Sequence, residues 1–256
     1  MAQFIDLLQA CAVVIPVVHG PRGEDGSLAA LLDFARVPYV GSGVRAGALA
    51  MDKWTTKLIA EAVGVRTAPG GLAGGVSPAF PVVVKPAAAG SSFGVTRADD
   101  ASQLDAAIAV ARRLDDRVLV ESFVTGREVD IAVLARADGS RLVSAPLEIV
   151  VADGLFDTTR KYDGSADLRV PAMLSQDELA ELRRQALAVF DALGCSGVAR
   201  VDFFLTADGL VLNEVNTMPG MTAQSQVPRM FDAVGLPHPA LLDALIEGAL
   251  YSAARA

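Results

Sequence analysis

Residues 197–220 carry the pattern that decides the fold, and they read GVARVDFFLTADGLVLNEVNTMPG. Two runs rich in β-forming residues flank residues 207–209, an Ala-Asp-Gly sequence that is typical of a hairpin loop. Side chains alternate between the two faces of a strand, so a three-residue loop centred on position 208 brings four polar side chains onto one face. These four form the expected cross-strand pairs Asp202 with Glu214 and Arg200 with Asn216.

The polar face of this hairpin has the composition of a binding site. Two carboxylates and an amide oxygen beside an arginine suit a hard divalent cation that carries phosphate groups. Alternation by itself is also typical of a half-buried hairpin whose polar face is solvated. We favour the binding site because the face carries Arg, Asp, Glu and Asn and not Lys or Thr. The opposite, apolar face is expected to pack on a core and comprises Val201, Phe203, Leu205, Val211 and Val215.

The size and composition of the chain indicate a globular enzyme. Its 256 residues suffice for one large domain or for a few lobes with joined cores. A hydrophobic content of 52% and a charged content of 20% argue against disorder. The net charge of −8 argues against a nucleic-acid partner. An acidic protein that binds an anionic nucleotide must gather positive charge locally, so lysines and arginines near glycines are the residues of interest.

The sequence indicates a cytoplasmic protein without a membrane partner. No uninterrupted apolar stretch is long enough to span a bilayer. The apolar run at residues 7–18 resembles a signal peptide but lacks a basic start, so we predict a β-strand there. Cys11 and Cys195 both have apolar neighbours, which favours buried thiols in a reducing cytosol.

A glycine-rich loop follows the end of that strand. We predict that Ser27 caps a short helix after the loop and that residues 37–41 form the next strand, which makes a βαβ step of a parallel sheet. Ligands bind at the carboxyl ends of strands in such sheets, and His19 lies there. A lone histidine is more often structural than catalytic, and the local sequence gives His19 no other role.

Two lysines lie close to glycine-rich segments in the next part of the chain. Residues 46–63 have the periodicity of a helix that carries Lys53, and a Gly/Ala-rich linker follows. Residues 80–86 form a short buried strand that contains Lys85 near its end and runs into a loop of small residues at 87–95. The backbone N–H groups of such a loop can hold phosphate oxygens. The loop lacks the ending of a Walker A motif, so a hairpin that covers a nucleotide fits it better.

Acidic residues mark the following strands. We predict a helix that starts at Asp100, a strand at 118–124 and another from position 125. Glu121 and Glu128 lie on either side of the link between these strands. Each of them alone is most often a surface carboxylate.

The rest of the chain combines a polar segment with helices. Residues 148–167 are polar and turn-rich, as in a mobile lid. Ser175 and Glu178 form a capping box for a long amphipathic helix. The loop at 219–225 is expected near the polar face of the hairpin, and residues 239–251 are expected to form a closing helix.

These motifs, in this order, resemble the D-alanine–D-alanine ligase family. The resemblance implies an α/β protein with the ATP-grasp fold, in which two α+β lobes hold ATP between antiparallel sheets beside an N-terminal parallel α/β lobe. We expect a partial N-terminal lobe at residues 1–52, a central lobe at 53–124 and a C-terminal lobe at 125–256. The motifs that carry the resemblance are residues 19–26 (HGPRGEDG), 38–43 (PYVGSG), 51–53 (MDK), 84–86 (VKP), 90–95 (GSSFGV), 200–202 (RVD) and 213–220 (NEVNTMPG).

The resemblance also implies the reaction. ATP phosphorylates the carboxylate of a first D-alanine, and the amine of a second D-alanine attacks the acyl phosphate through a tetrahedral intermediate. The product is a precursor of peptidoglycan. The family implies ATP with two Mg²⁺ ions, or Mn²⁺ in their place, and a homodimer in the cytoplasm.

Site residues follow from the resemblance at the matching positions. The metal ligands are Asp202, Glu214 and Asn216. The phosphates of ATP are contacted by Lys53, Lys85 and Lys161 and are covered by the loop that contains Gly90, Ser92 and Gly94. The adenine lies along Glu121 and Phe123, and the ribose on Glu128.

The same resemblance implies which residues contact the substrates and the developing oxyanion. Arg200 and the Gly220 N–H stabilise the oxyanion. His19 lies in the first substrate's pocket, and Ser225 holds the carboxylate of the second. Ser91 and Tyr162 hydrogen-bond each other and lock the lid. In this family a Tyr at that position goes with D-alanine and a Phe with D-lactate, so Tyr162 favours a dipeptide product.

The chain departs from the family pattern at three places, which leaves two alternatives open. It begins partway through the N-terminal lobe, so the glutamate that holds the first substrate's amine is missing. Ser122 replaces a usual lysine beside the adenine, and Ala88-Ala89 replaces a bulkier pair in the phosphate loop. The alternatives are an ATP-grasp ligase for other amino acids and a truncated, non-catalytic ATP-binding protein.

Overall fold

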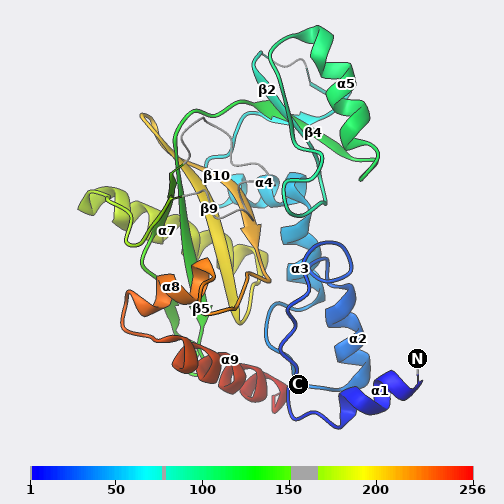
Figure 1. Ribbon diagram of the computed structural model, residues 1–256, viewed down its shortest axis with the longest axis vertical. Helices are drawn as coiled ribbons and strands as arrows, with labels where there is room; N and C mark the ends of the chain where they lie inside the picture. Colours follow the sequence, from blue (N-terminus) through cyan, green and yellow to red (C-terminus); the bar gives the residue numbers. More distant parts are fainter. Residues whose placement is uncertain (1, 77–78, 151–166, 256) are drawn as a thin grey trace.

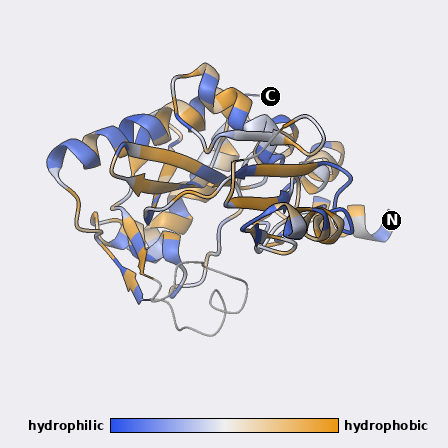
Figure 2. Cartoon of the chain, turned by 90° about the horizontal axis from the view of Figure 1, so that it is seen from above, coloured by the Kyte–Doolittle hydropathy of each residue, from blue (hydrophilic) through white to orange (hydrophobic). Residues whose placement is uncertain are grey.

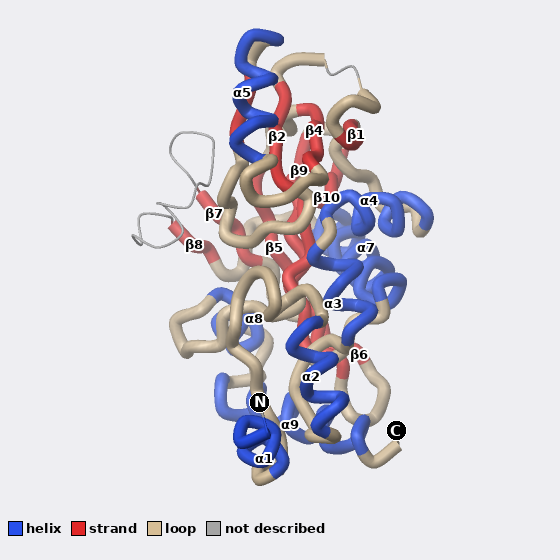
Figure 3. Tube along the Cα trace, turned by 90° about the vertical axis from the view of Figure 1, so that its right-hand side faces the viewer, coloured by secondary structure: helices blue, strands red, loops and turns tan. Residues whose placement is uncertain are grey.

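The computed structural model describes residues 2–76, 79–150 and 167–255. Two antiparallel sheets form its framework, one of four strands and one of six. Figure 1 and Figure 3 both show the four-stranded sheet at one end of the molecule and the first two helices at the other. The strands are mostly hydrophobic in Figure 2, and helices with mixed surfaces surround them.

The N-terminal segment is more helical than its sequence predicts. The apolar run expected to be a strand begins within α1 (Ala2–Gln9), and its extended part forms only one parallel bridge, from Val14 to Tyr39. The expected βαβ step is thus reduced to this bridge around α2 (Ser27–Ala35).

The start of α2 corrects the prediction that Ser27 caps this helix. Gly26 is the N-cap residue, in a left-handed conformation with φ 88°, and Ser27 is already helical. The Ser27 N–H donates to the Asp25 carboxylate at 2.9 Å. The aspartate therefore accepts one of the first N–H groups of the helix, which have no acceptor within the helix.

The single helix predicted at 46–63 is two helices, α3 (Val44–Met51) and α4 (Lys53–Ala62). Asp52 separates them because it is extended, with ψ 100°, and its carboxylate accepts the Thr55 N–H at 2.8 Å. An N-cap of this kind starts a new helix. Lys53 is consequently the first residue of α4 and not an interior residue of a longer helix.

The four-stranded sheet has the order β1-β4-β2-β3 and is covered by α5. Valines of the two central strands pack against alanines of the helix, and Asp100 caps that helix as predicted. The bounds of these elements are β1 (Gly70–Leu72), β2 (Val82–Pro86), β3 (Thr96–Ala98), α5 (Ala101–Ala111) and β4 (Val118–Ser122).

The six-stranded sheet has the order β10-β9-β5-β7-β8, and β6 also pairs with β5. Helices pack on both of its faces, with α3, α4 and α7 against one core and α8 and α9 against the other. The predicted capping box of Ser175 and Glu178 starts α7. The bounds are β5 (Arg127–Ala135), β6 (Arg141–Val143), β7 (Leu147–Val150), β8 (Asp167–Arg169), α7 (Gln176–Leu193), β9 (Val198–Thr206), β10 (Gly209–Asn216), α8 (Gln226–Asp232) and α9 (His238–Ala253).

The β9–β10 hairpin has the predicted pairing for a different reason. Gly209 pairs with Thr206, so the connection holds two residues and not three. A β-bulge between Leu212 and Glu214 adds the missing residue and restores the predicted pairs of 202 with 214 and 200 with 216.

The position of the bulge also corrects the predicted apolar face. Val211 precedes the bulge and pairs with Phe204, so it lies on the face of Asp202 and not on the core face. Leu210 and Leu212 take its place in the core.

Among the described residues, no helix is both long enough and apolar enough to cross a membrane. The two cysteines differ from each other. Cys195 is buried as predicted, and burial raises the pKa of its thiol to about 12. The prediction of a buried thiol is wrong for Cys11, which is exposed just after α1.

This difference predicts selective labelling by a thiol reagent such as iodoacetamide. At pH 8 the native protein should react once per chain, at Cys11, because the buried Cys195 thiol stays protonated far above that pH. Mass spectrometry should find a second adduct only after denaturation in urea. Cys11→Ser should abolish the native reaction, and equal labelling of both native thiols would contradict the assignment.

Candidate active site

A cavity of about 470 Å³ lies between the two sheets. Its volume is in the range of small-molecule binding sites. One wall comes from β2 and β4 of the small sheet, and the other from β5, β7, β9 and β10 of the large one. The linker between β4 and β5 also lines the cavity. Lys53 and Lys85 belong to the lining as well.

The polar face of the hairpin is held by an ion pair within β9. The Arg200 guanidinium donates from Nε and Nη2 to the two oxygens of Asp202, both at 2.7 Å. Burial would lower the pKa of Arg200, but the charge of Asp202 outweighs it and raises that pKa further above its usual value. The guanidinium is therefore a permanent cation inside the site.

A buried aspartate on the neighbouring strand completes this pair. Asp130 of β5 is opposite Asp202 in the sheet and is 0% exposed. Its Oδ2 lies 3.5 Å from the Arg200 Nε. Sequence analysis missed Asp130 because it is the one acidic residue in an otherwise apolar strand interior, where alternation gives no hint of its partner.

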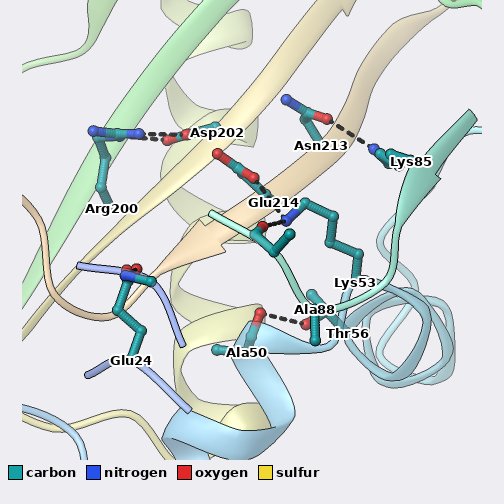
Figure 4. Close-up of polar contacts among 12 residues, drawn as sticks. Glu24, Ala50, Lys53, Thr56, Lys85, Ala88, Arg200, Asp202, Asn213 and Glu214 are labelled. Carbon is teal, nitrogen blue, oxygen red and sulfur yellow. Dashed lines mark hydrogen bonds and ion pairs between the residues drawn. The ribbon is translucent and has the colours of Figure 1, made fainter. Parts of the chain in front are cut away.

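The other predicted metal ligands also contact donors of the protein. The Glu214 Oε2 lies 3.3 Å from the Lys53 Nζ, and the Asn216 Oδ1 accepts the Met218 N–H at 2.9 Å. Figure 4 shows the side chains of Glu214 and Lys53 pointing toward each other. Glu214 is directly across from Asp202 in the register of the hairpin. The fold thus brings the three predicted ligands to one end of the hairpin.

The chemistry of this donor set fits a hard cation. Two carboxylates and one amide oxygen are the ligands that Mg²⁺ and Mn²⁺ accept in proteins. Within residues 2–76, 79–150 and 167–255, no group of three or more His, Cys, Asp or Glu could hold a metal ion. A metal at the hairpin would therefore need the Asn216 amide together with the carboxylates of Asp202 and Glu214.

Lysines from the other elements reach the same region. The Lys53 Nζ donates to the Ala89 carbonyl at 3.0 Å, which links α4 to the small-residue loop at 87–95. The Lys85 Nζ donates to the Asn213 Oδ1 at 3.4 Å, across the cavity from β2 to β10. Both lysines therefore stand between the two sheets.

The small-residue loop has an unusual backbone. Ser91 and Ser92 adopt left-handed conformations with φ 56° and 57°. Gly90 packs against the N-terminal glycine-rich loop, since a Cβ at Gly90 would lie 3.3 Å from the Gly20 Cα. A side chain at position 90 would push these two loops apart.

Glu121 lies between two lysines and not only along the expected adenine wall. Its carboxylate contacts the Nζ of Lys85 and, at 3.0 Å, the Nζ of Lys57. Burial would raise the pKa of Glu121, but the two ammonium groups outweigh it and lower that pKa. Sequence analysis missed Lys57, although its spacing of four residues from Lys53 on a helix puts both on one side.

The far end of the cavity is mainly apolar and suits a base. Phe123 lies in the lining with Val83 and Leu212, and Glu128 lines the cavity beside them. The Arg97 guanidinium stacks over the Phe123 ring at 4.5 Å from its centroid. That Glu121 and Phe123 hold an adenine stays a prediction.

An ion pair joins two neighbouring inner strands at this end of the cavity. Arg127 donates to both oxygens of Glu148, at 2.7 and 2.8 Å, and also to the Met173 carbonyl at 2.8 Å. The hydrogen bonds from Arg127 lower the pKa of Glu148. The pair joins β5 to β7 next to Glu128.

The N-terminal motif brings a further carboxylate to the site. Glu24 accepts the Gly20 N–H at 2.5 Å, and burial raises the pKa of Glu24. In Figure 4 its side chain extends from the N-terminal loop toward the hairpin end. His19, the residue predicted from this motif, is exposed.

The loop after the hairpin gathers the predicted acyl-transfer residues. A Cβ at Gly220 would lie 2.9 Å from the Ser225 Oγ, so the two are in contact. The Ser225 Oγ also accepts the Thr222 N–H at 3.1 Å. The next residue, Gln226, was not predicted, and its side chain contacts Arg200. The predicted Lys161 and Tyr162 lie outside the described residues.

Comparison with known proteins gives the family of the chain. A family model described as the D-ala D-ala ligase C-terminus matches residues 76–247, and one for the D-ala D-ala ligase N-terminus matches residues 2–42. The D-alanine--D-alanine ligase of Mycolicibacterium smegmatis is 47% identical over 265 residues, which covers 96% of this chain and 70% of that protein.

Two solved structures share the architecture. VanG D-Ala:D-Ser ligase from Enterococcus faecalis superposes with a TM-score of 0.83 at 35% identity, and covers 94% of this chain and 73% of its own. D-alanine--D-alanine ligase from Bacillus anthracis, complexed with ATP, superposes with a TM-score of 0.84 at 26% identity, over 99% of this chain and 84% of its own. The chain belongs to the D-alanine–D-alanine ligase family and has the ATP-grasp fold of that family.

Proposed function

We propose that this chain joins two D-alanine molecules at the expense of ATP, through an acyl phosphate, to supply a precursor of peptidoglycan. The observation that carries the proposal is the convergence of one hairpin face with lysines from two other elements. Glu214 contacts Lys53 at 3.3 Å, and Asn213 contacts Lys85 at 3.4 Å across the cavity. Phosphoryl transfer consists mostly of positioning and charge neutralisation, which this arrangement supplies.

The metal site follows from the donor set. Asp202, Glu214 and Asn216 would hold Mg²⁺, with Mn²⁺ as the other candidate. The bound ion would neutralise the phosphate oxygens of ATP. For this the Asp202 and Glu214 carboxylates must share their protein partners, Arg200 and Lys53, with the ion.

The nucleotide would lie along the cavity. Lys53 and Lys85 would contact its phosphates, with Lys161 from the segment after β7, and the loop with Gly90, Ser92 and Gly94 would cover them. Phe123 would bound the adenine, and Glu128 would bind the ribose. Glu121 would act mainly by holding Lys85 in place, because its carboxylate contacts that lysine directly.

The acyl-transfer end would lie at the open end of the hairpin, where Arg200 pairs with Asn216, and at the loop after β10. Arg200 and the Gly220 N–H would stabilise the oxyanion of the tetrahedral intermediate, because both are fixed donors. Ser225 would hold the carboxylate of the second substrate, His19 would border the first, and Ser91 would pair with Tyr162. We further propose lobes at residues 1–52, 53–124 and 125–256, a homodimer and a cytoplasmic location.

A second acceptor has support in one comparison. The E. faecalis structure is a D-Ala:D-Ser ligase at 35% identity, so D-serine is a candidate second substrate within the same fold. A ligase for other amino acids and a non-catalytic ATP-binding protein are the remaining alternatives.

Phosphate release from ATP distinguishes these functions. The protein should release phosphate with Mg²⁺ and D-alanine, and mass spectrometry should detect the dipeptide. D-serine, D-lactate and L-alanine, each added with D-alanine, test the second acceptor, and D-alanine should be preferred. ATP turnover that none of these substrates stimulates would refute the ligase function.

Glu214→Gln tests the metal assignment. Loss of one ligand charge should lower kcat by roughly 100-fold or more, since a bound metal contributes several kcal/mol to the transition state. The urea concentration at the unfolding midpoint should be the same as for the wild type. The matched control is Glu247→Gln on the exposed side of α9, which should keep full activity. Near-normal turnover of Glu214→Gln would contradict the assignment.

Lys57→Met tests the role of the buried lysine pair. With one partner removed, the Glu121 carboxylate keeps a single ammonium in a buried space, so the free energy of unfolding should fall by about 3 kcal/mol. The KM for ATP should also rise, because Lys85 is then the one ammonium among the described residues that contacts Glu121. Urea unfolding and steady-state kinetics measure the two effects. Arg113→Met on an exposed position is the control, and an unchanged unfolding free energy would contradict the role.

A further inference from the structure

Arg200 receives a contact from outside the sheet. Its Nη1 donates to the Gln226 Oε1 at 2.6 Å, while its Nε and Nη2 donate to Asp202. A guanidinium has five N–H groups. Among the residues that the structure describes, three of these groups have acceptors, and one N–H remains on each terminal nitrogen.

The two sides of the guanidinium are held by different kinds of residue. Asp202 holds one side. It is also a proposed metal ligand, so its carboxylate would have to bind the ion as well as Arg200. Gln226 holds the other side and has no part in the metal site. Its contact can therefore persist when Asp202 turns toward the ion.

Gln226 is well placed for this task because its backbone is anchored. It is the first residue of α8, and the next residue, Val227, is only 1% exposed within the core below the sheet. Met230 and Phe231 of the same helix are fully buried. A side chain whose backbone is held by buried neighbours keeps its contact atom in a well-defined position.

The chemistry of the amide also suits the site. Arg200 already lies beside the carboxylates of Asp202 and Asp130. An amide oxygen accepts a hydrogen bond without adding a third negative charge. A further carboxylate here would oppose the negative charge that develops on the oxyanion.

We propose that Gln226 is a positioning residue for the ligation reaction, which holds the Arg200 guanidinium so that its remaining N–H groups meet the oxyanion. This inference rests on the proposed function, because the role of Arg200 in acyl transfer is part of it. Gln226 acts through Arg200 and does not itself touch the reacting atoms.

Gln226→Met removes the acceptor and keeps the length of the side chain. It should lower kcat about 10- to 100-fold, the value of one hydrogen bond to a charged group, with the KM for ATP within about twofold. The urea midpoint should not move. Gln176→Met on the exposed start of α7 is the matched control and should behave like the wild type. An unchanged kcat of Gln226→Met would overturn the proposal.

A double-mutant cycle separates positioning from packing. Lysine lacks the Nη1 group, so in an Arg200→Lys background Gln226→Met should have little further effect on kcat. Equal fold-losses in both backgrounds would show that Gln226 acts independently of Arg200 and would overturn the proposal.

NMR of arginine labelled with ¹⁵N gives a readout that does not need activity. In the wild type the two terminal nitrogens of Arg200 should give separate resonances, because contacts on both sides slow the rotation of the guanidinium. In Gln226→Met they should merge or broaden. Identical spectra of the wild type and Gln226→Met would overturn the proposal for Gln226, even if the enzyme is active. If the wild type shows no turnover, the proposed function is refuted. The NMR comparison then still decides whether Gln226 holds Arg200.

Discussion

The site depends on one electrostatic constraint, which is that acids buried side by side need a cation between them. Asp130 and Asp202 are opposite each other on neighbouring strands, and they are 0% and 2% exposed. Arg200 lies within 2.7 Å of one carboxylate and 3.5 Å of the other. Removing its charge would leave two desolvated carboxylates in contact range, which is strongly unfavourable. The register of β5 against β9 and the position of Arg200 therefore require each other.

The same arrangement recurs around the cavity. Lys53 of α4 pairs with Glu214 of β10, and Lys57 and Lys85 enclose Glu121. The acid and the base of each contact come from different elements, so these pairs join the helices and both sheets around the cavity. The break in the helix at Asp52 contributes to these contacts, because it makes Lys53, the partner of Glu214, the first residue of α4. The charged side chains around the cavity are thus already paired with one another. A ligand that enters the cavity must replace one partner in such a pair.

Local patterns predicted much of the fold and which polar residues of the hairpin lie together. Hairpin alternation, the capping box and the motif lysines depend on residues close in sequence, and the structure has them together. The failures have a common cause in contacts distant in sequence. Asp130 and Gln226 acquire their roles only through Arg200, which reaches them from another strand. The strand expected at residues 7–18 and the buried state expected for Cys11 failed because apolar residues alone do not specify which surface covers them.

The bulge between Leu212 and Glu214 separates two kinds of evolutionary change in the hairpin. Length changes at the exposed turn shift the pairing on the turn side, and a compensating change at the bulge can restore the frame beyond it. Deletion of the bulged residue with the turn unchanged would give a regular ladder, in which Glu214 still pairs with Asp202 and every side chain from 214 to 216 keeps its face. The turn and the bulge are therefore two separate places where the hairpin can gain or lose a residue while Glu214 stays opposite Asp202.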